Sequence, residues 1–469
     1  MRKTFTLLLG LLFGATLLFG QTAHKLESVT ENFQIFWIID SPEDLIWLTD
    51  TANLDPDNDA TPDFDSVGSK WDANYRLGAN IEFDPDSSKV DWNNDGTVDI
   101  AGTSDSVGLA EIGNWTSPTE TVARFGGTFD GQYYTIHNVY KKGLNRGGLI
   151  STIQGAQIEN VILLNFRNYA DNGYQGGIVG RATYEPGVGD DNLIKRCWVE
   201  GTFMFDESTT DNLYSAGIVG RFQYGTISEC VSIVTGVANI TGQRRFSGII
   251  GQMEGASSVS DCYAIVDITA EEQFGGLLGR VAADPTATIS NSYAVSTLTG
   301  KEPADQRGGF AGDIVGPVPT SCYWDIDMEA IGVGGGDAAA IAAPVGLTTA
   351  EFSDQAKFVG WNFTDTWAIG DVGGVQRPYL KWQDMRQPAT GISDSRAINS
   401  LNVYPNPVSG ILSIENAPLN SEYRMVNIVG QTVKSGIIHS RTMRLNVSDC
   451  EKGVYLLRVG NNVSKILVK

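Results

Sequence analysis

The sequence predicts an all-β protein in which a parallel β-helix solenoid with end caps precedes a small antiparallel β-sandwich domain. A glycine-rich block recurs at intervals of 29, 40, 31, 28 and 33 residues, and periods of this length are typical of solenoids. A short segment rich in β-branched and aromatic residues follows each block and has the polar alternation of a strand. Residues 401–469 instead alternate strand-like and turn-like segments, as small antiparallel sandwiches do.

The glycine-rich blocks predict the corners of successive coils. Glycine adopts positive φ angles and lets neighbouring backbones approach closely, and the apolar pair between the glycines, such as Ile178 and Val179, would fill the coil interior. The block FGGLLGR at residues 274–280 has the motif of neither a phosphate loop nor a dinucleotide-binding loop, so we interpret the blocks as architecture rather than ligand loops. The six blocks are GGLIST at Gly147, GGIVGR at Gly176, AGIVGR at Ala216, SGIIGQ at Ser247, GGLLGR at Gly275 and GGFAGD at Gly308.

The segments after the blocks predict strands that stack from one coil to the next. Parallel strands of adjacent coils would lie about 4.8 Å apart, which places equivalent side chains in columns. A β-propeller is the alternative, but its blades need four strands in about 40–45 residues, and most intervals here are shorter. The six segments are IENVILLNF at Ile158, IKRCWVEGTF at Ile194, ISECVSIVTG at Ile227, VSDCYAIVDI at Val259, ISNSYAVSTL at Ile289 and PTSCYWDID at Pro319.

These repeats resemble the GLUG motif of bacterial surface proteins, which is described there as part of a right-handed β-helix. The resemblance extends upstream to FGGTFDGQYYTIHNVY at residues 125–140. It extends downstream to CYWDID at Cys322, FVGWNF at Phe358 and RPYLKW at Arg377. The resemblance implies that the solenoid is right-handed.

The amino-terminal end of the stack needs a cap, because an open end exposes backbone polar groups and apolar side chains. The segment SPEDLIWLTD offers Ser41 as the N-cap of a helix and Pro42 as its first residue. Leu45, Trp47 and Leu48 would then cover the first coil.

The carboxyl-terminal end of the stack needs a cap for the same reason. Thr348 and Glu351 have the spacing of a capping box and predict a helix start. We expect Trp361, Trp367 and Trp382 to plug this end, because aromatic side chains bury large areas; a sugar-binding platform is the alternative.

The last segment resembles the type A sorting domain of the type IX secretion system. It carries the family's motifs in order: YPNP (Tyr404, Pro405, Asn406, Pro407), GVYLLRV (with Gly453 and Tyr455) and KILVK (Lys465 to Lys469). The middle motif, NIVGQTV, departs from the family because it lacks an aromatic residue before its glycine. The resemblance implies secretion through the outer membrane, with the secretion machinery and its sortase as partners and surface lipopolysaccharide as the anchor.

The sequence divides into six predicted parts. Arg2 and Lys3 precede an apolar run that is too short for a comfortable transmembrane helix, which indicates a signal peptide, and no other stretch is long enough to span a membrane. The parts are a signal peptide (1–23), an N-terminal cap and first coils with acidic loops (24–124), the repeat solenoid (125–330), its C-terminal cap (331–390), a linker (391–400) and the sorting domain (401–469).

The net charge excludes one class of partner. At pH 7 the formal charge is −22, so phosphate backbones would repel the protein, and we expect no nucleic acid partner.

The segment DWNNDGTVD is the best candidate metal site. Position 12 of a calcium loop beginning here would be glycine instead of the usual bidentate glutamate, although the acidic residues 54–65 could supply a carboxylate. We predict a Ca²⁺ site; the alternative is an acidic loop that only keeps the surface soluble. The ligands would be Asp91, Asn93, Asp95, the Thr97 carbonyl and Asp99.

The sequence predicts no catalytic residue. Its three histidines, His24, His137 and His439, belong to three different regions, which argues against a histidine-based triad or zinc site. No pair of carboxylates stands out at a spacing that a glycosidase would need.

Three arginines occupy the same position of the repeat: Arg181, Arg221 and Arg280. They could form a basic stripe along one edge of the solenoid. The alternative, which we favour at this point, is a solvated edge balanced by acidic neighbours.

Four of the five cysteines share one repeat position, the third after the residue that opens each strand segment. In parallel coils their Cβ atoms would lie about 4.8 Å apart, whereas disulfides prefer about 3.8 Å, so we expect buried free thiols. The four are Cys197, Cys230, Cys262 and Cys322, Val161 and Ser292 fill the same slot elsewhere, and Cys450 belongs to the tail.

These observations favour a non-enzymatic, secreted or surface-anchored protein with adhesin-like binding of a glycan or protein ligand. One alternative is a carbohydrate-active enzyme, a polysaccharide lyase or hydrolase with the solenoid flank as its groove. The other is a structural component of the envelope or matrix. Fold alone does not decide between them.

Overall fold

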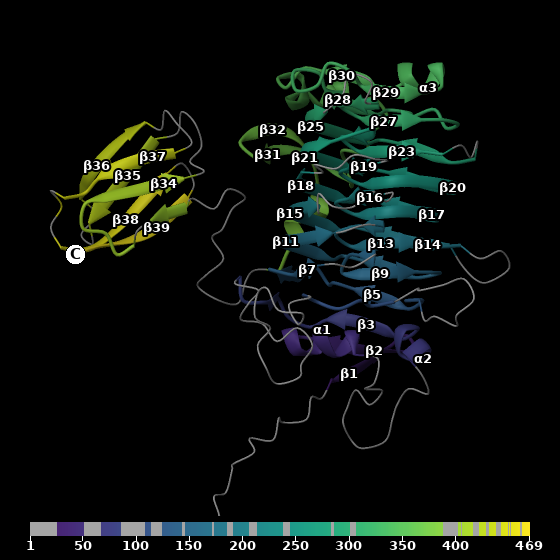
Figure 1. Ribbon diagram of the computed structural model, residues 1–469, viewed down its shortest axis with the longest axis horizontal. Coiled ribbons are helices and arrows are strands. Elements are labelled where there is room, and N and C mark those ends of the chain that lie inside the picture. The colour runs from purple at the N-terminus through teal and green to yellow at the C-terminus, as the bar shows by residue number, and fades with distance from the viewer. Residues whose placement is uncertain are drawn as a thin grey trace, which may run out of the picture. The chain divides into compact units, whose positions relative to one another are not determined.

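The computed structural model describes residues 26–50, 67–85, 108–113, 124–142, 146–170, 173–184, 191–205, 213–237, 244–282, 286–300, 306–387, 402–404, 406–415, 422–427, 431–437, 442–448, 450, 452–459 and 462–469. These residues are mainly strands, and successive coils stack from β3 to β30 in the order of the sequence (Figure 1). The predicted parallel β-helix is therefore confirmed.

Three sheets form the walls of the solenoid, and apart from the antiparallel pair β1–β2 their strands pair in parallel from coil to coil. Sheet A consists of β1 (Ser28–Glu31), β2 (Gln34–Ile39), β3 (Asn74–Leu77), β5 (Thr128–Asp130), β9 (Ile150–Ile153), β10 (Gln157–Glu159), β13 (Val179–Ala182), β14 (Asn192–Lys195), β17 (Val219–Ser228), β20 (Ile250–Ser260), β23 (Leu278–Val281), β24 (Thr288–Ser290), β27 (Ala311–Ile314) and β29 (Val333–Gly336). Sheet B consists of β4 (Ile81–Glu82), β6 (Thr135–His137), β7 (Tyr140–Lys142), β11 (Ile162–Ala170), β15 (Trp198–Phe205), β18 (Val231–Val237), β21 (Tyr263–Ala270), β25 (Tyr293–Gly300), β28 (Tyr323–Asp325) and β30 (Val345–Leu347). Sheet C consists of β8 (Arg146–Gly147), β12 (Gly173–Gln175), β16 (Leu213–Ala216), β19 (Arg244–Ser247), β22 (Gln273–Gly275) and β26 (Gln306–Gly308).

One coil illustrates how the chain turns. From β12 in sheet C it passes through Gly176 and Gly177 into β13 of sheet A, and then through β14 into β15 of sheet B. A Cβ atom on Gly177 would lie 2.3 Å from the carbonyl oxygen of Gly217 in the next coil, so this corner has room only for glycine. The glycine blocks are coil corners, as predicted.

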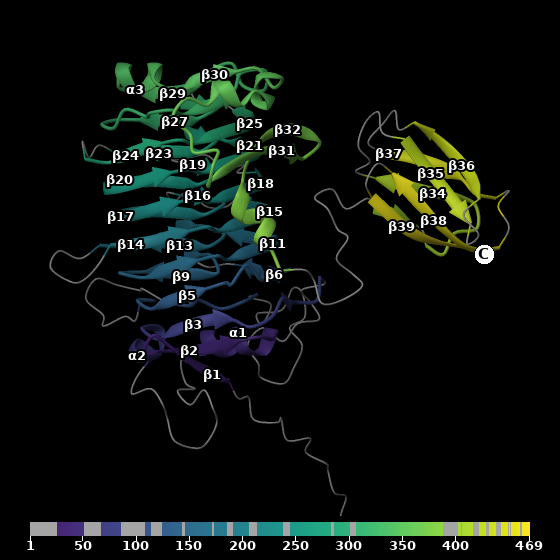
Figure 2. The same cartoon turned by 180° about the vertical axis from the view of Figure 1, so that it is seen from behind.

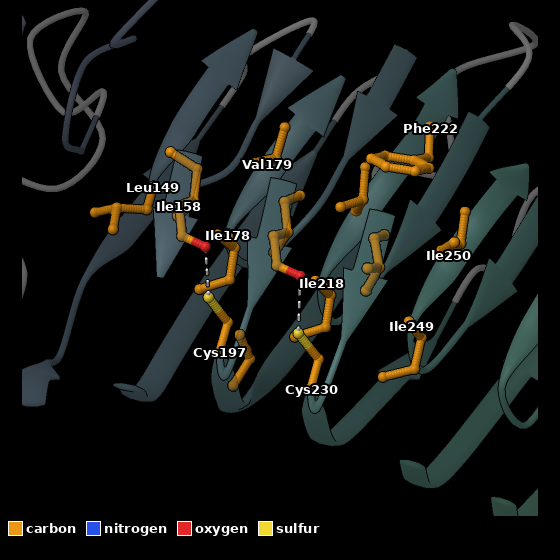
Figure 3. Close-up of a cluster of buried hydrophobic side chains, with 14 of the residues drawn as sticks. Leu149, Ile158, Ile178, Val179, Cys197, Ile218, Phe222, Cys230, Ile249 and Ile250 are labelled. Carbon is orange, nitrogen blue, oxygen red and sulfur yellow. Dashed lines mark hydrogen bonds between the residues drawn. The ribbon is translucent and has the colours of Figure 1, made fainter. Parts of the chain in front are cut away.

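Apolar side chains stack in columns inside the solenoid (Figure 3). Val179 is paired with Ile150 on one side and with Val219 on the other, and Ile158 is paired with Ile194. None of these side chains has any exposed area. Because burying an aliphatic side chain contributes about 1.5–3 kcal/mol, such columns are the main source of the solenoid's stability.

The turn from sheet A to sheet B repeats in each coil with one residue in the left-handed conformation. These residues are Asn160, Arg196, Glu229, Asp261, Asn291 and Ser321, with φ angles between 48° and 57°. The residue that follows fills the slot noted in the sequence. Cys197, Cys230, Cys262 and Cys322 lie there as buried free thiols, as expected, and burial raises the pKa of Cys322 to about 12.

The amino-terminal end of the stack is covered by α1 (Pro42–Thr49) together with α2 (Val67–Trp71). The predicted helix start is confirmed: the Asp44 N–H donates to Ser41 Oγ at 3.2 Å, and the Ser41 N–H donates to Asp44 Oδ2 at 2.9 Å. Leu45, Trp47 and Leu48 are buried, so the apolar side of the helix closes the core.

The carboxyl-terminal coil contains β29, α3 (Ala338–Ala342) and β30. After β30 the chain leaves the stack and runs back along the outer surface of sheet B, beside β18 and β15 (Figure 2). We call residues 351–369 and 377–386 the strap. Its elements are η2 (Glu351–Ser353), η3 (Gln355–Lys357), η4 (Lys381–Met385) and parts of the paired strands β31 (Trp367–Val372) and β32 (Val375–Leu380). Thr348 and Glu351 make the two bonds of the predicted capping box, since the Thr348 N–H donates to Glu351 Oε2 at 2.9 Å and the Glu351 N–H donates to Thr348 Oγ1 at 3.4 Å. The helix that follows is the short 3-10 helix η2, and its N-cap is Ala350 rather than Thr348.

The three tryptophans that we expected at the open end lie instead against the side of the solenoid. Trp361 Nε1 donates to the Ser321 carbonyl at 2.9 Å, Trp367 Nε1 to Asp261 Oδ1 at 3.0 Å, and Trp382 Nε1 to the Glu229 carbonyl at 2.9 Å. The reason is that sheet B presents outward tyrosines in these coils, which need an apolar cover. The tryptophan side chains are buried, so they do not form a sugar platform.

The carboxyl-terminal unit is a small antiparallel sandwich, as predicted. One sheet contains β33 (Asn402–Tyr404), β34 (Ile411–Glu415) and β37 (Thr442–Asn446); the other contains β35 (Glu422–Asn427), β36 (Thr432–Ile437), β38 (Gly453–Val459) and β39 (Asn462–Val468). Leu412 from the first sheet and Met425, Leu457 and Ile466 from the second share one fully buried core.

Candidate functional site

Arginine and tyrosine side chains from sheets A and C meet on one flank of the solenoid, where Arg181 of β13 and Arg221 of β17 lie over the ring of Tyr174 of β12. Four of these residues stand at paired positions of adjacent strands in sheet C. Two arginines stand at paired positions of adjacent strands in sheet A. We call this group the Arg–Tyr surface. Its residues are Arg146, Tyr174, Tyr214 and Arg245 from sheet C and Arg181 and Arg221 from sheet A.

The two tyrosines are the centre of the Arg–Tyr surface. The rings of Tyr174 and Tyr214 are stacked, with centroids 5.3 Å apart. The guanidinium groups of Arg181 and Arg221 each lie 5.4 Å from the Tyr174 centroid, and that of Arg245 lies 4.4 Å from the Tyr214 centroid. Cation–π attraction at these distances holds the arginines against the rings.

Hydrogen bonds fix Arg221 in the middle of the surface. Its Nη1 donates to the Tyr174 hydroxyl at 3.1 Å, and its Nη2 donates to Glu254 Oε2 at 2.6 Å. The same carboxylate oxygen accepts from Gln223 Nε2 at 2.7 Å. Glu254 therefore pairs with Arg221, while the charge of Glu111 acts on Arg146.

Burial disfavours the charge of three arginines of this surface, whereas Glu254 and Tyr174 raise the pKa of Arg221. Burial, together with the neighbouring Arg221, lowers the pKa of Arg181 to about 10. Burial also lowers the pKa of Arg146 and of Arg245. All of these groups still carry their charge at neutral pH, so the surface is cationic on a protein whose net charge is −22.

Arg245 is the most deeply placed member, with 4% of its area exposed. Its Nε donates to Gln273 Oε1 at 2.8 Å, while its buried Nη1 has no hydrogen-bond partner. A buried donor of this kind is costly unless an oxygen of a ligand or of water accepts from it.

The sequence identified only part of this surface. It placed Arg181, Arg221 and Arg280 at one repeat position, and the ladder confirms that position. Arg221 is paired with Glu254 at 2.6 Å and Arg280 with Asp313 at 3.4 Å, so at both positions the edge is balanced by an acidic neighbour, as the favoured interpretation held.

Reasoning from the sequence missed the four sheet C residues. Each of Tyr174, Tyr214 and Arg245 stands two residues before a glycine block, which is the signal that could have revealed them.

A hollow of about 740 Å³ lies on sheet B. Its exposed lining includes Met204 and Val237, which are adjacent in the ladder, and the hydroxyls of Thr202 and Thr235, which are hydrogen-bonded at 3.1 Å. Asp267 adds the single carboxylate of the lining.

The predicted calcium ligands Asp91, Asn93, Asp95, Thr97 and Asp99 lie outside the described residues, so calcium binding stays a prediction. In the part of the chain that the structure describes, no group of three or more His, Cys, Asp or Glu side chains is arranged to hold a metal ion. His137 lies in sheet B, where its Nε2 is 3.0 Å from Thr135 Oγ1.

The predicted sorting motifs lie on both sheets of the carboxyl-terminal unit. Asn406 joins two of them: its Nδ2 donates to the Lys465 carbonyl at 2.7 Å, and its Oδ1 accepts from the Leu467 N–H at 2.8 Å. Tyr455 is buried in the core of the unit. Tyr404, Pro407, Lys465 and Lys469 are exposed, Gly453 begins β38, and Pro405 lies outside the described residues.

Residues 402–469 match the family model described as the secretion system C-terminal sorting domain. These residues are a type IX secretion sorting domain. The protein is therefore secreted by that system to the cell surface or the extracellular space, and the secretion machinery is a partner. No helix among the described residues is long and apolar enough to cross a membrane.

Two further comparisons concern the whole chain. None of the curated proteins compared with it has a significantly similar sequence. The crystal structure of a "putative immunoglobulin A1 protease" from Bacteroides ovatus is similar at 18% sequence identity and a TM-score of 0.46, covering 74% of this chain and 92% of that one.

Proposed function

We propose that this protein is a non-enzymatic binding protein of the cell surface, in which the solenoid flank holds an extracellular ligand with adhesin-like function. The observation that supports it is the Arg–Tyr surface, where cations and stacked rings from several coils converge on one flank. Its side chains can hold a ligand by charge, hydrogen bonds and ring contacts. The proposal includes the assignment of the repeats to the GLUG motif, which they resemble.

The chemistry of the surface suits binding better than proton transfer. Its guanidinium groups stay protonated at neutral pH, because even the most shifted pKa, that of Arg181, is about 10. The nearest carboxylate, Glu254, accepts hydrogen bonds from Arg221 and Gln223, so it is held as a structural anion.

We propose that the sorting domain also leads to attachment of the protein to the cell. The sortase of the secretion system would remove this domain and join the remaining chain to lipopolysaccharide. The signal peptide at residues 1–23, which lies outside the described residues, would start the export.

An array of glycans and surface proteins tests the binding function. The full chain is applied beside Arg181→Gln and beside Arg196→Gln, a control on the turn between sheets A and B, where Arg196 is paired with Glu159 at 3.7 Å. We expect at least one ligand whose signal falls in Arg181→Gln and not in the control. The absence of any such ligand would remove the binding function from this surface.

A polysaccharide lyase is the second candidate, because two groups that could take up a proton lie close together. The pKa of Arg181 is lowered, and the neighbouring Tyr174 hydroxyl accepts a hydrogen bond from Arg221. Incubation with uronate polysaccharides, followed by the ultraviolet absorbance of unsaturated products, decides between the two. Product formation that is lost in Tyr174→Phe would replace the non-enzymatic proposal.

A further inference from the structure

We infer that the Arg–Tyr surface binds a linear acidic polysaccharide, whose carboxylate or sulfate groups are held by arginines of successive coils. This inference rests on the proposed binding function and names its ligand class. It is carried by charge complementarity, by the spacing of the cations and by the unpartnered donor of Arg245.

The cations are arranged along the axis of the solenoid. Arg181 and Arg221 are direct ladder partners, so their backbones are about 4.8 Å apart. On sheet C the ladder runs from Arg146 through the two tyrosines to Arg245. A chain that carries an anionic group at regular intervals would meet a cation repeatedly if it lay parallel to this axis.

The row of cations has a defined end. Beyond Arg245 the sheet C ladder continues with Gln273 and then Gln306, which are neutral. Beyond Arg221 the sheet A ladder continues through Gln252 to Arg280, whose charge is paired with Asp313. Gln273 Nε2 donates to Gln306 Oε1 at 2.8 Å and lies 3.2 Å from Asp313 Oδ2, so these side chains satisfy one another. Anionic groups are therefore bound in the coils that contain Arg146 to Arg245.

The tyrosine rings favour a sugar chain over other polyanions. Sugars combine apolar C–H faces with polar edges, and the Tyr174 and Tyr214 side chains, each partly exposed, offer ring surface between the cations. The net charge of −22 opposes any polyanion, and it opposes nucleic acid most, because the duplex carries about one charge per 1.7 Å.

Arg245 and Glu254 give the inference a two-sided test. Arg245 has a buried Nη1 that an anionic oxygen would satisfy, so its loss should weaken binding. Glu254 opposes any ligand anion and occupies Arg221, so its neutralisation should strengthen binding. A residue with a merely structural role would not increase affinity when it is removed.

Titration calorimetry of the full chain with polygalacturonate, dextran sulfate and uncharged dextran tests the inference. We expect binding of one or both polyanions and none of dextran, with affinity about tenfold lower in Arg245→Gln and several-fold higher in Glu254→Gln. Arg196→Gln, which removes one charge elsewhere, should bind as the unmodified chain does. The two polyanions distinguish carboxylate from sulfate recognition.

Three outcomes overturn the inference. The first is polyanion binding no stronger than dextran binding. The second is equal affinity in Glu254→Gln and the unmodified chain. This variant keeps the test decisive even if replacement of the more buried Arg245 prevents folding. The third is a neutral glycan or protein ligand that is lost in Arg181→Gln while no polyanion binds; the proposed function then stands and only the ligand class is wrong.

Discussion

At the scale of single residues, the cysteine slot does more than hold small side chains. Cys262 Sγ accepts the Cys230 N–H at 3.4 Å and donates to the Ser260 carbonyl at 3.2 Å. One coil further on, Ser292 Oγ accepts the Cys262 N–H at 3.1 Å. The slot residue therefore satisfies a buried N–H of the preceding coil, which a purely apolar residue could not do.

Replacement of Cys262 tests this role. Cys262→Ser should preserve stability, because serine already makes the equivalent bonds at Ser292. Cys262→Val should lower the free energy of unfolding by about 1–3 kcal/mol, because the Cys230 N–H loses its acceptor. Chemical denaturation of both variants measures the difference, and equal loss in the two would show that only packing matters.

Val161 explains when the slot tolerates an apolar residue. In the coil before it, the Gln132 N–H is accepted by Asp130 Oδ1 at 3.0 Å, so no slot acceptor is needed. The hydrogen bonds make serine a closer substitute for the cysteines of this column than valine.

Glu200 makes stability depend on pH. Burial raises its pKa from 4.5 to about 7, although Arg386 and Trp198 partly oppose the shift. The folded state therefore binds more protons than the unfolded state between pH 4.5 and 7, and the contribution of Glu200 to stability is lost as the pH rises through this window. The free energy of unfolding of Glu200→Gln, compared with that of the unmodified chain, should be about 1–3 kcal/mol more favourable at pH 8 than at pH 5. Chemical denaturation of both proteins at both pH values measures this difference. A constant difference between the two proteins would contradict the assignment.

At the scale of elements, the strap is held by its tryptophans rather than by a sheet of the solenoid. Trp367 has no exposed area, packs against Trp361 with the ring centroids 4.3 Å apart, and donates a hydrogen bond to Asp261. Tyr293 and Tyr263 of sheet B add hydrogen bonds to Pro378 and Gln383. These contacts bury the outward tyrosines that sheet B would otherwise expose.

Trp367→Ala should release the strap before the solenoid unfolds. Removing a buried tryptophan costs about 3–5 kcal/mol, and the cost falls on the strap because the coils keep their own core. Limited proteolysis should cut residues 351–386 in this variant while the repeats resist. Val359→Ala, a change at a side chain with 71% exposure, serves as the control. Simultaneous loss of strap and repeats would show that the two form one cooperative unit.

At the scale of the whole molecule, the solenoid and the sorting domain have separate hydrophobic cores. Deletion of residues 402–469 should therefore leave the solenoid folded but stop its secretion. In the native host the truncated chain should be found by immunoblot in the periplasmic fraction, while the full chain reaches the surface or the medium. An unchanged melting temperature of the solenoid confirms that the deletion acts on sorting, and equal surface amounts would count against it.

The repeat was predictable because its period places similar residues in each coil. Ile158, Ile194 and Ile227 occupy one column in both sequence and structure, and Ser41 with Asp44 forms the expected helix start. The sorting motifs were recognisable because they occur in a fixed order.

The strap and the sheet C ladder were harder to foresee. The strap has no repeat, and the position of Trp382 beside Glu229, 153 residues earlier, depends on a long-range hydrogen bond that no local pattern encodes. Sheet C strands such as β8 and β12 have two to three residues, too few for an alternation to be seen, so only its place before a glycine block could have revealed Tyr174.

The course of the strap also determines how the protein would respond to a pulling force. The last described residues of the strap lie beside the coil of Glu229, because Trp382 is hydrogen-bonded to that residue. Tension applied to the chain beyond Arg386 would thus reach the middle of the stack first, and the terminal coil would be loaded only after the tryptophan contacts had broken one by one. The strap would therefore bear the force first and protect the last coils from separating from their neighbours.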